Sequence, residues 1–176
     1  MDLYQNIFRL IDLRSFSNIW YWIVLALMWS SLSHYVMGVP FDMVVRARRR
    51  GGEALADLET LVRVQARRRV RIAAVAGPWI VGVTAACLTV LAMLGFVYRI
   101  QLGQALFLLL APAALVGLLG VLAARRLEAA PLEGEALCDF LSRQRLWVQL
   151  LGAIAIFVTA VWGVMQLLLV PVLGTG

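Results

Sequence analysis

The sequence predicts an all-α polytopic membrane protein, with four transmembrane helices arranged as two hairpins. Hydrophobic residues make up 62% of the 176 residues and the mean hydropathy is +0.87, whereas an ordinary soluble domain is about 45–50% apolar. Four runs without charge occupy residues 15–41, 72–98, 100–124 and 146–176, and each exceeds the roughly 20 residues that a spanning helix needs. Because these runs fill most of the chain, we expect a single membrane domain over residues 1–176.

The four expected helices lie near residues 18–39, 72–97, 100–124 and 146–171. The first run is too long for a signal-peptide core of about 7–15 residues, so we expect it to remain as a helix. Before it, Leu3, Ile7, Leu10 and Ile11 fall on one helical face. That spacing predicts either a short N-terminal interfacial helix over residues 2–14 or an extension of the first transmembrane helix.

The arginines predict the orientation. Nine of the sixteen lie in the connection 42–71 and four in the connection 125–145, whereas the link between the second and third helices carries Arg99. Basic residues in short connections hold those connections inside the cell. We therefore expect 42–71 and 125–145 to be cytoplasmic hairpins in a bacterial inner membrane, with both termini in the periplasm.

The basic segment also has a helical pattern after Gly51-Gly52. Leu55, Leu58 and Val62 recur at helical spacing, and no helix breaker follows until Gly77-Pro78, so we expect one long helix that rises from the cytoplasm into the membrane. The second cytoplasmic hairpin carries a matching stripe, and we expect the two stripes to pack together and the acid–arginine rims around them to face a protein partner. The partner-docking candidates are Leu55, Leu58, Glu59, Val62 and Phe140, and the matching stripe is Leu137, Phe140 and Leu141.

The arginine clusters have two interpretations beside that topological one. Basic residues next to a membrane helix attract anionic lipids at about 1 kcal/mol each, which makes Arg46, Arg48, Arg49, Arg50, Arg67, Arg68, Arg69 and Arg71 candidates for contact with lipid headgroups. Binding of nucleic acid is not expected, because no recognition motif accompanies the charge.

A weak internal repeat links the two hairpins. The stretch "GEALADL" at 52–58 returns as "GEALCDF" at 134–140, and an "ARR" precedes each copy, at 47–49 and 124–126. An acid–arginine pair at i,i+4 follows, Glu59–Arg63 in the first copy and Asp139–Arg143 in the second. The chain is then two like hairpins in parallel orientation, unless the similarity reflects shared composition.

Reactive groups are scarce. The predicted spans contain no Asp, Glu, Lys or Arg, which argues against an ion-coupled transporter and against an enzyme. Cys87 and Cys138 lie far apart without metal-ligand spacing, and we expect no metal and no cofactor. His34 could ligate a haem with Met37 or Met165, but a lone histidine near a helix end more often makes a hydrogen bond.

Small residues four apart predict faces at which helices approach closely. The pairs are Ala73/Gly77, Gly82/Ala86, Ala113/Gly117 and Thr159/Gly163. We also expect Trp29, Trp79 and Trp162 to pack against neighbouring helices.

The segments "IDLRSFSN", "SHYVMGVPFDMV" and "RARRRGG", within residues 4–52, resemble a family of small bacterial membrane proteins called "component of SufBCD complex". The rest of the chain matches that family in helix count. The resemblance implies a partner role in iron–sulfur cluster assembly, a cytoplasmic process, and it supplies no catalytic residues.

Together these patterns favour a non-catalytic accessory, scaffold or assembly subunit that binds a larger membrane or cytoplasmic protein complex, with membrane lipids as further partners. One alternative, which rests on the resemblance, is a membrane tether for iron–sulfur assembly proteins. Another is a carrier or channel for a neutral or apolar solute. Copurifying partners would favour the first two, and a polar-lined cavity at mid-membrane would favour the third.

Overall fold

The computed structural model describes residues 19–173, and this part of the chain contains five α-helices and one β-hairpin. The interfacial helix expected at 2–14 lies outside the described residues. In chain order the elements are α2 (Ile19–His34), β1 (Tyr35–Val36), β2 (Val39–Pro40), α3 (Phe41–Arg50), α4 (Gly52–Ala92), the π-helical turn η2 (Met93–Val97), α5 (Gln101–Ala129) and α6 (Gly134–Leu173).

Three of these helices are long and apolar enough to cross a membrane: α4 together with η2, α5, and α6. They contain the second, third and fourth expected spans, so the chain has the helical architecture of a multi-pass membrane protein. The described part of α2 has 16 residues. At 1.5 Å per residue it is about 24 Å long, shorter than the roughly 30 Å hydrocarbon core of a bilayer.

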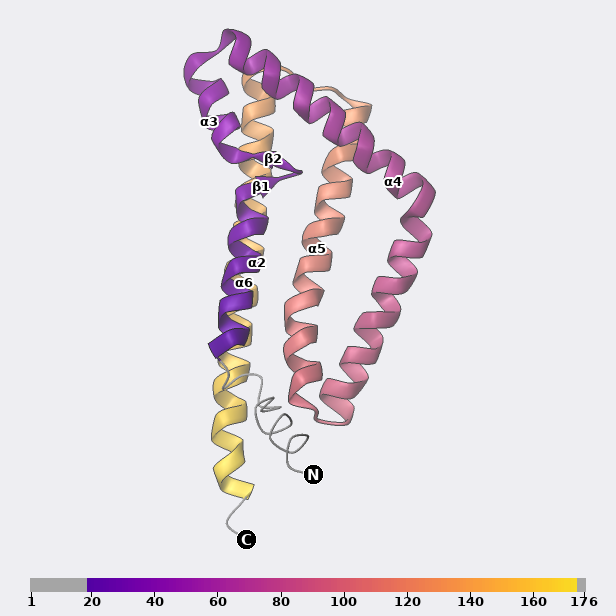
Figure 1. Ribbon diagram of the computed structural model, residues 1–176, viewed down its shortest axis with the longest axis vertical. Helices are drawn as coiled ribbons and strands as arrows, with labels where there is room; N and C mark the ends of the chain where they lie inside the picture. Colours follow the sequence, from indigo (N-terminus) through magenta and orange to yellow (C-terminus); the bar gives the residue numbers. More distant parts are fainter. Residues whose placement is uncertain (1–18, 174–176) are drawn as a thin grey trace, which may run out of the picture.

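Figure 1 shows α2, α5 and α6 running alongside one another, while the first part of α4 crosses obliquely over their ends. In the second part, α4 bends and returns beside α5 to η2. Pro78 lies inside α4, and its missing N–H removes one backbone hydrogen bond there. Residues 35–71 and 120–145 form the end of the molecule at which α4 crosses the other helices. We call this end the head.

The first helix ends at His34, so the helix expected to reach residue 39 is shorter than the hydropathy indicated. Residues 35–40 form a hairpin in which Tyr35 pairs with Pro40 and Val36 with Val39. Met37 and Gly38 at its tip have φ values of 55° and 81°, the left-handed conformation that a tight two-residue turn requires. Pro40 disfavours helix at the residue before it, so this apolar stretch turns instead of continuing.

The single long helix expected after Gly51-Gly52 is confirmed, because α4 continues without a break from Gly52 to Ala92. With 41 residues, α4 is about 62 Å long, and α6 with 40 residues is about 60 Å long. Each is about twice the thickness of a hydrocarbon core, so both helices must extend beyond it. Both copies of the "GEAL" repeat begin one of these helices, at Gly52 and Gly134, whose φ values are 50° and 62°.

In the apolar part, two glycine contacts bring helices close together. A β-carbon on Gly103 of α5 would lie 2.7 Å from the backbone nitrogen of Gly95 in η2, and one on Gly152 of α6 would lie 2.7 Å from the Trp29 ring of α2. Beside the first contact, the Gln104 side chain donates to Gly95 O at 2.8 Å and accepts from Trp162 Nε1 at 3.0 Å.

Most of the small-residue faces that the sequence predicted do not lie at these close helix contacts. A β-carbon on Gly77, Gly82 or Gly117 would meet nothing within 4 Å, so no residue between 19 and 173 covers those faces. Thr159 and Gly163 are buried, as expected. The expectation for Trp79 is wrong, because its side chain is 78% exposed.

Candidate functional site

The head has a continuous hydrophobic core in which the two stripes meet. Leu58 from α4 and Leu137 and Leu141 from α6 are at most 2% exposed. They pack in one cluster with residues from the hairpin, α3 and the end of α5. The charged connections are therefore a folded unit and not a pair of loose loops.

The apolar side chains that the sequence analysis named as partner-docking candidates are packed inside the head. Leu58 and Val62 lie inside the cluster, and Leu55 and Phe140 are partly buried against it. These four residues therefore support the charged outer surface of the head from within.

The charged residues of the head join different helices. Glu59 of α4 accepts a hydrogen bond from the backbone N–H of Gly134, the first residue of α6, at 2.7 Å. Arg48 of α3 pairs with Asp139 of α6, and Arg63 lies 3.8 Å from Glu133. The i,i+4 pairs expected for Glu59 with Arg63 and for Asp139 with Arg143 are thus replaced by contacts that tie the α4, α3 and α6 segments together.

A second contact fixes α3 on α6. The guanidinium carbon of Arg145 lies 3.9 Å from the centre of the Phe41 ring, a distance at which cation–π attraction operates. Together with the Arg48–Asp139 pair, this contact holds both ends of the ten-residue helix. Val44 and Ala47 on its inner side are buried in the head core, so its outer side has a fixed position.

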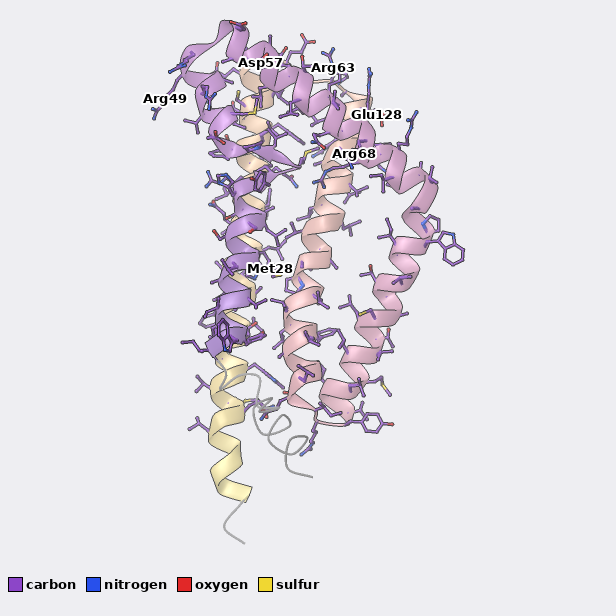
Figure 2. The ribbon with its side chains drawn as sticks, viewed as in Figure 1. Met28, Arg49, Asp57, Arg63, Arg68 and Glu128 are labelled. Carbon is purple, nitrogen blue, oxygen red and sulfur yellow. The ribbon has the colours of Figure 1, made fainter. Side chains whose placement is uncertain are left out.

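That outer side is basic. Arg49 and Arg50 are exposed and have no acidic partner among the described residues, and Arg46 lies 3.4 Å from Asp42 on the same helix. Figure 2 shows Arg49 pointing away from the rest of the molecule. A shallow hollow along the helix is lined by Asp42, Val45, Arg46, Arg49 and Arg50.

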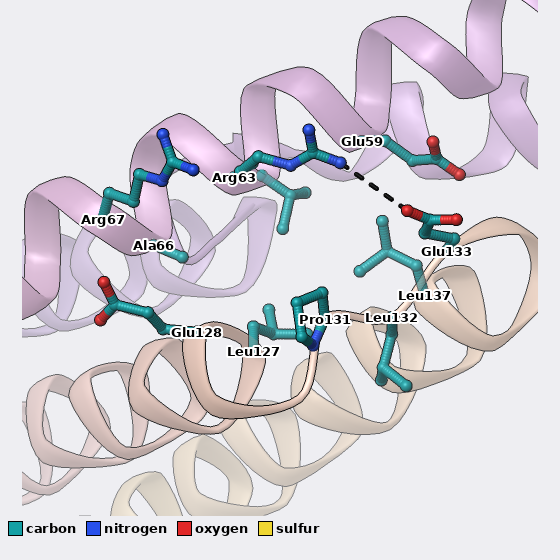
Figure 3. A pocket seen from close by; sticks show the side chains of 11 residues that line it. Glu59, Arg63, Ala66, Arg67, Leu127, Glu128, Pro131, Leu132, Glu133 and Leu137 are labelled. Carbon is teal, nitrogen blue, oxygen red and sulfur yellow. Dashed lines mark ion pairs between the residues drawn. The ribbon is translucent and has the colours of Figure 1, made fainter.

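A groove of about 390 Å³ lies on another side of the head, between α4 and the turn that joins α5 to α6 (Figure 3). Val62, Ala66 and Leu127 contribute apolar lining, and the Arg63–Glu133 pair spans it. Arg67 and Glu128 also line the groove, and neither has an ion-pair partner in the described chain. Positive and negative groups alternate here, in contrast to the outer side of α3.

The remaining lipid-headgroup candidates divide into two groups. Arg67, Arg68 and Arg71 are exposed on α4, whereas Arg69 is half-buried. Burial lowers the pKa of Arg69. The sequence did not separate Arg69 from its neighbours, although a signal was present: it continues the buried stripe of Leu58, Val62 and Ala66 at helical spacing.

His34 and Cys138 lie in different surroundings. His34 is exposed at the end of α2 and its ring stacks edge-on against Tyr35, whereas Met37 is buried in the head core and Met165 is exposed on α6. Cys138 is 1% exposed in the head core, and burial raises the pKa of its thiol. A protonated, enclosed thiol is a poor metal ligand, because the ligating form is the thiolate.

Comparison with known proteins does not assign the site. No family model, curated protein or solved structure matches this chain.

Proposed function

We propose that this chain is a non-catalytic accessory or scaffold subunit of a bacterial inner membrane, which binds a cytoplasmic protein complex through the basic head. The observation that best supports this proposal is the outer side of α3. A short helix that is fixed at both ends presents Arg46, Arg49 and Arg50, and no described residue gives Arg49 or Arg50 an acidic partner. A partner with a carboxylate-rich surface complements such a face, because opposite charges steer and orient association.

The proposed placement in the membrane adds α2 as a fourth span beside α6. Thirteen of the sixteen arginines and eight of the ten acidic residues lie in residues 41–71 and 125–145, whereas Arg99 follows η2 at the opposite end of α4. The positive-inside rule then puts the head in the cytoplasm and both termini in the periplasm.

Reporter insertions test that placement. We expect a reporter inserted at Gly51-Gly52 to read cytoplasmic and one fused after Gly176 to read periplasmic. A cytoplasmic C-terminal reporter would contradict the four-span arrangement.

The family resemblance of residues 4–52 suggests one kind of partner, the cytoplasmic machinery of iron–sulfur cluster assembly. In that case the chain would act as a membrane tether. The burial of Cys138 favours a tether that docks protein surfaces over one that ligates a cluster.

Copurification after gentle detergent extraction tests the docking role. We expect the double substitution Arg49→Glu with Arg50→Glu to leave the protein folded, because both side chains are exposed and form no ion pair with a described residue. We also expect it to reduce partner recovery strongly. The matched control is Arg125→Glu with Arg126→Glu, which makes the same charge change on exposed residues at the end of α5.

Equal recovery of the same partners by both double variants would contradict docking on α3. If native membranes yield no partner at all, the scaffold proposal fails and the carrier for a neutral solute becomes the leading alternative.

A further inference from the structure

The guanidinium of Arg69 lies in the angle between α4, α5 and the β1–β2 hairpin, where two glycines border it. A β-carbon on Gly120 of α5 would lie 2.8 Å from Arg69 Nη1, and one on Gly38 at the hairpin tip would lie 3.7 Å from Nη2. The absence of a side chain at Gly120 therefore provides space that the guanidinium occupies.

This half-buried cation has no acidic partner among the residues that the structure describes. Arg69 makes no hydrogen bond and no ion pair within residues 19–173, so its five N–H donors have no acceptor from the described chain. Burial lowers the pKa of Arg69, which is the response of a cation to partial loss of water. Arginine nevertheless stays charged in proteins, and the uncompensated charge favours an anion from outside the chain.

Gln65 lies beside the guanidinium, four residues earlier on the same face of α4. Its Cδ and Oε1 atoms are 3.5 Å from the same β-carbon position on Gly38 that Arg69 Nη2 approaches. The atom that Gln65 presents there is a hydrogen-bond acceptor, so the donors for an anion come from the planar guanidinium of Arg69, whose fork of N–H groups suits the oxygens of one phosphate.

The position of Arg69 along α4 suggests where such a phosphate comes from. The charge-free run of α4 begins at Ile72, three residues later, so Arg69 lies at the boundary of the apolar part. Beyond it, 6% of the most apolar stretch of α4 is buried, compared with 22% for α5 and 28% for α6. The open space at Gly77 and Gly82 of α4 and at Gly117 of α5 leaves room for acyl chains against these helices.

We infer that Arg69, enclosed between α5 and the hairpin tip, forms a phosphate-binding site whose ligand is the phosphodiester of an anionic lipid in the inner leaflet. The acyl chains of that lipid lie along the uncovered faces of α4 and α5. Such a site differs from diffuse attraction to the thirteen arginines of the two connections, because one fixed guanidinium dominates it. The inference requires the head to face lipid headgroups, but it does not depend on a protein partner at α3.

Native mass spectrometry of the purified chain, titrated with phosphatidylglycerol or cardiolipin and with phosphatidylcholine as the neutral comparison, measures this binding. We expect Arg69→Gln to weaken binding of the anionic lipids at least about tenfold, as for a lost hydrogen bond to a charged group. Arg68→Gln removes the same charge from an exposed neighbour, and we expect it to weaken binding by less than about fivefold. Equal losses in the two variants would show that diffuse charge is responsible and would overturn the inference.

A second pair of variants leaves the charge unchanged. Gly120→Ala puts a methyl group against the guanidinium, whereas Gly117→Ala puts the same group into open space on the same helix. We expect the former to weaken lipid binding and the latter to leave it unaltered, with slow labelling of Cys138 confirming that both heads are folded. Equal affinity of the two alanine variants would contradict the site.

Inorganic phosphate distinguishes the two sources of the anion. Millimolar phosphate should not displace the lipid if the acyl chains contribute to binding. The ligand is soluble phosphate, and the lipid assignment is wrong, if three results are obtained together: phosphate binds the chain, Arg69→Gln abolishes phosphate binding, and phosphate displaces the lipid completely. Neither result bears on recovery of a protein partner through α3, so the two proposals fail separately.

Discussion

In the head, fourteen buried residues form one cluster, whereas in the apolar part the buried cluster of the described chain consists of Leu25, Trp29, Leu109 and Ala155. The difference follows from the solvent around each region, which is water for the head and lipid for the apolar part. Water drives apolar side chains together in the head, but lipid chains are as apolar as leucine and exert no such force between helices. The membrane helices meet instead at glycines and through the hydrogen bonds of Gln104.

The head and the apolar part also differ in the surface that they offer to a ligand. The head is a compact unit with a fixed basic surface, while α4 is largely uncovered in the apolar part. Binding of a protein partner is therefore expected at the head, and binding of lipid along α4.

The largest expected effect is in the head core. Leu58→Ala should lower the free energy of unfolding by about 2–5 kcal/mol, because it leaves a cavity in a packed cluster. Labelling of Cys138 during a denaturant titration measures it. In the native state labelling is slow, because the thiol is buried and its raised pKa lowers the thiolate fraction at pH 8.

The matched control for Leu58→Ala is Leu118→Ala on α5, which deletes the same atoms from a side chain that is 53% exposed in the apolar part. We expect a change below about 0.5 kcal/mol. Equal destabilisation by the two substitutions would show that the head and the membrane part are not held by different forces.

The second-largest loss of stability is expected at the junction of η2 and α5. Gly103→Ala places a methyl group 2.7 Å from a backbone nitrogen, which side-chain movement cannot relieve, and overpacking of this kind costs about 1–3 kcal/mol. Gly82→Ala, at an open position, should be tolerated. Thermal unfolding in detergent would compare the two variants, and an unchanged stability of Gly103→Ala would mean that η2 and α5 do not meet there.

A smaller effect is expected at the start of α6. Glu59→Ala removes the acceptor of the Gly134 N–H, and loss of such a helix-terminal acceptor costs about 1 kcal/mol. Glu59→Gln keeps an oxygen that can accept the bond, so it should recover part of the loss. If both variants match the wild type in the Cys138 assay, the contact contributes nothing to the head.

The smallest effect is expected for Arg63→Gln. The Arg63–Glu133 pair is exposed and 3.8 Å long, and exposed pairs contribute about 0–1 kcal/mol. Unfolding of this variant should lie within error of the wild type. A loss as large as that of Glu59→Ala would show that the groove charges support the head as strongly as the helix-terminal contact does.

The sequence by itself determined the positions of the three long apolar helices and the continuity of α4 from Gly52 into the apolar part. Hydrophobic run length and helical spacing are local properties, and they depend on the solvent more than on partners. The same spacing predicted that the stripe of Leu58 and Val62 would meet Leu137 and Leu141, because each stripe needs cover in water.

Only the tertiary structure decided where each charged and small residue acts. Glu59 could pair with Arg63 on its own helix, but the start of α6 offers it an unpaired backbone N–H. Gly77 and Gly103 look alike in sequence, yet only Gly103 meets a backbone. Arg69 is one of four arginines between residues 67 and 71, and it differs from the others because the crossing of α4 over α5 places Gly120 against its guanidinium. Such contacts join residues 8 to 75 positions apart, and their formation depends on how whole helices cross, which no local pattern encodes.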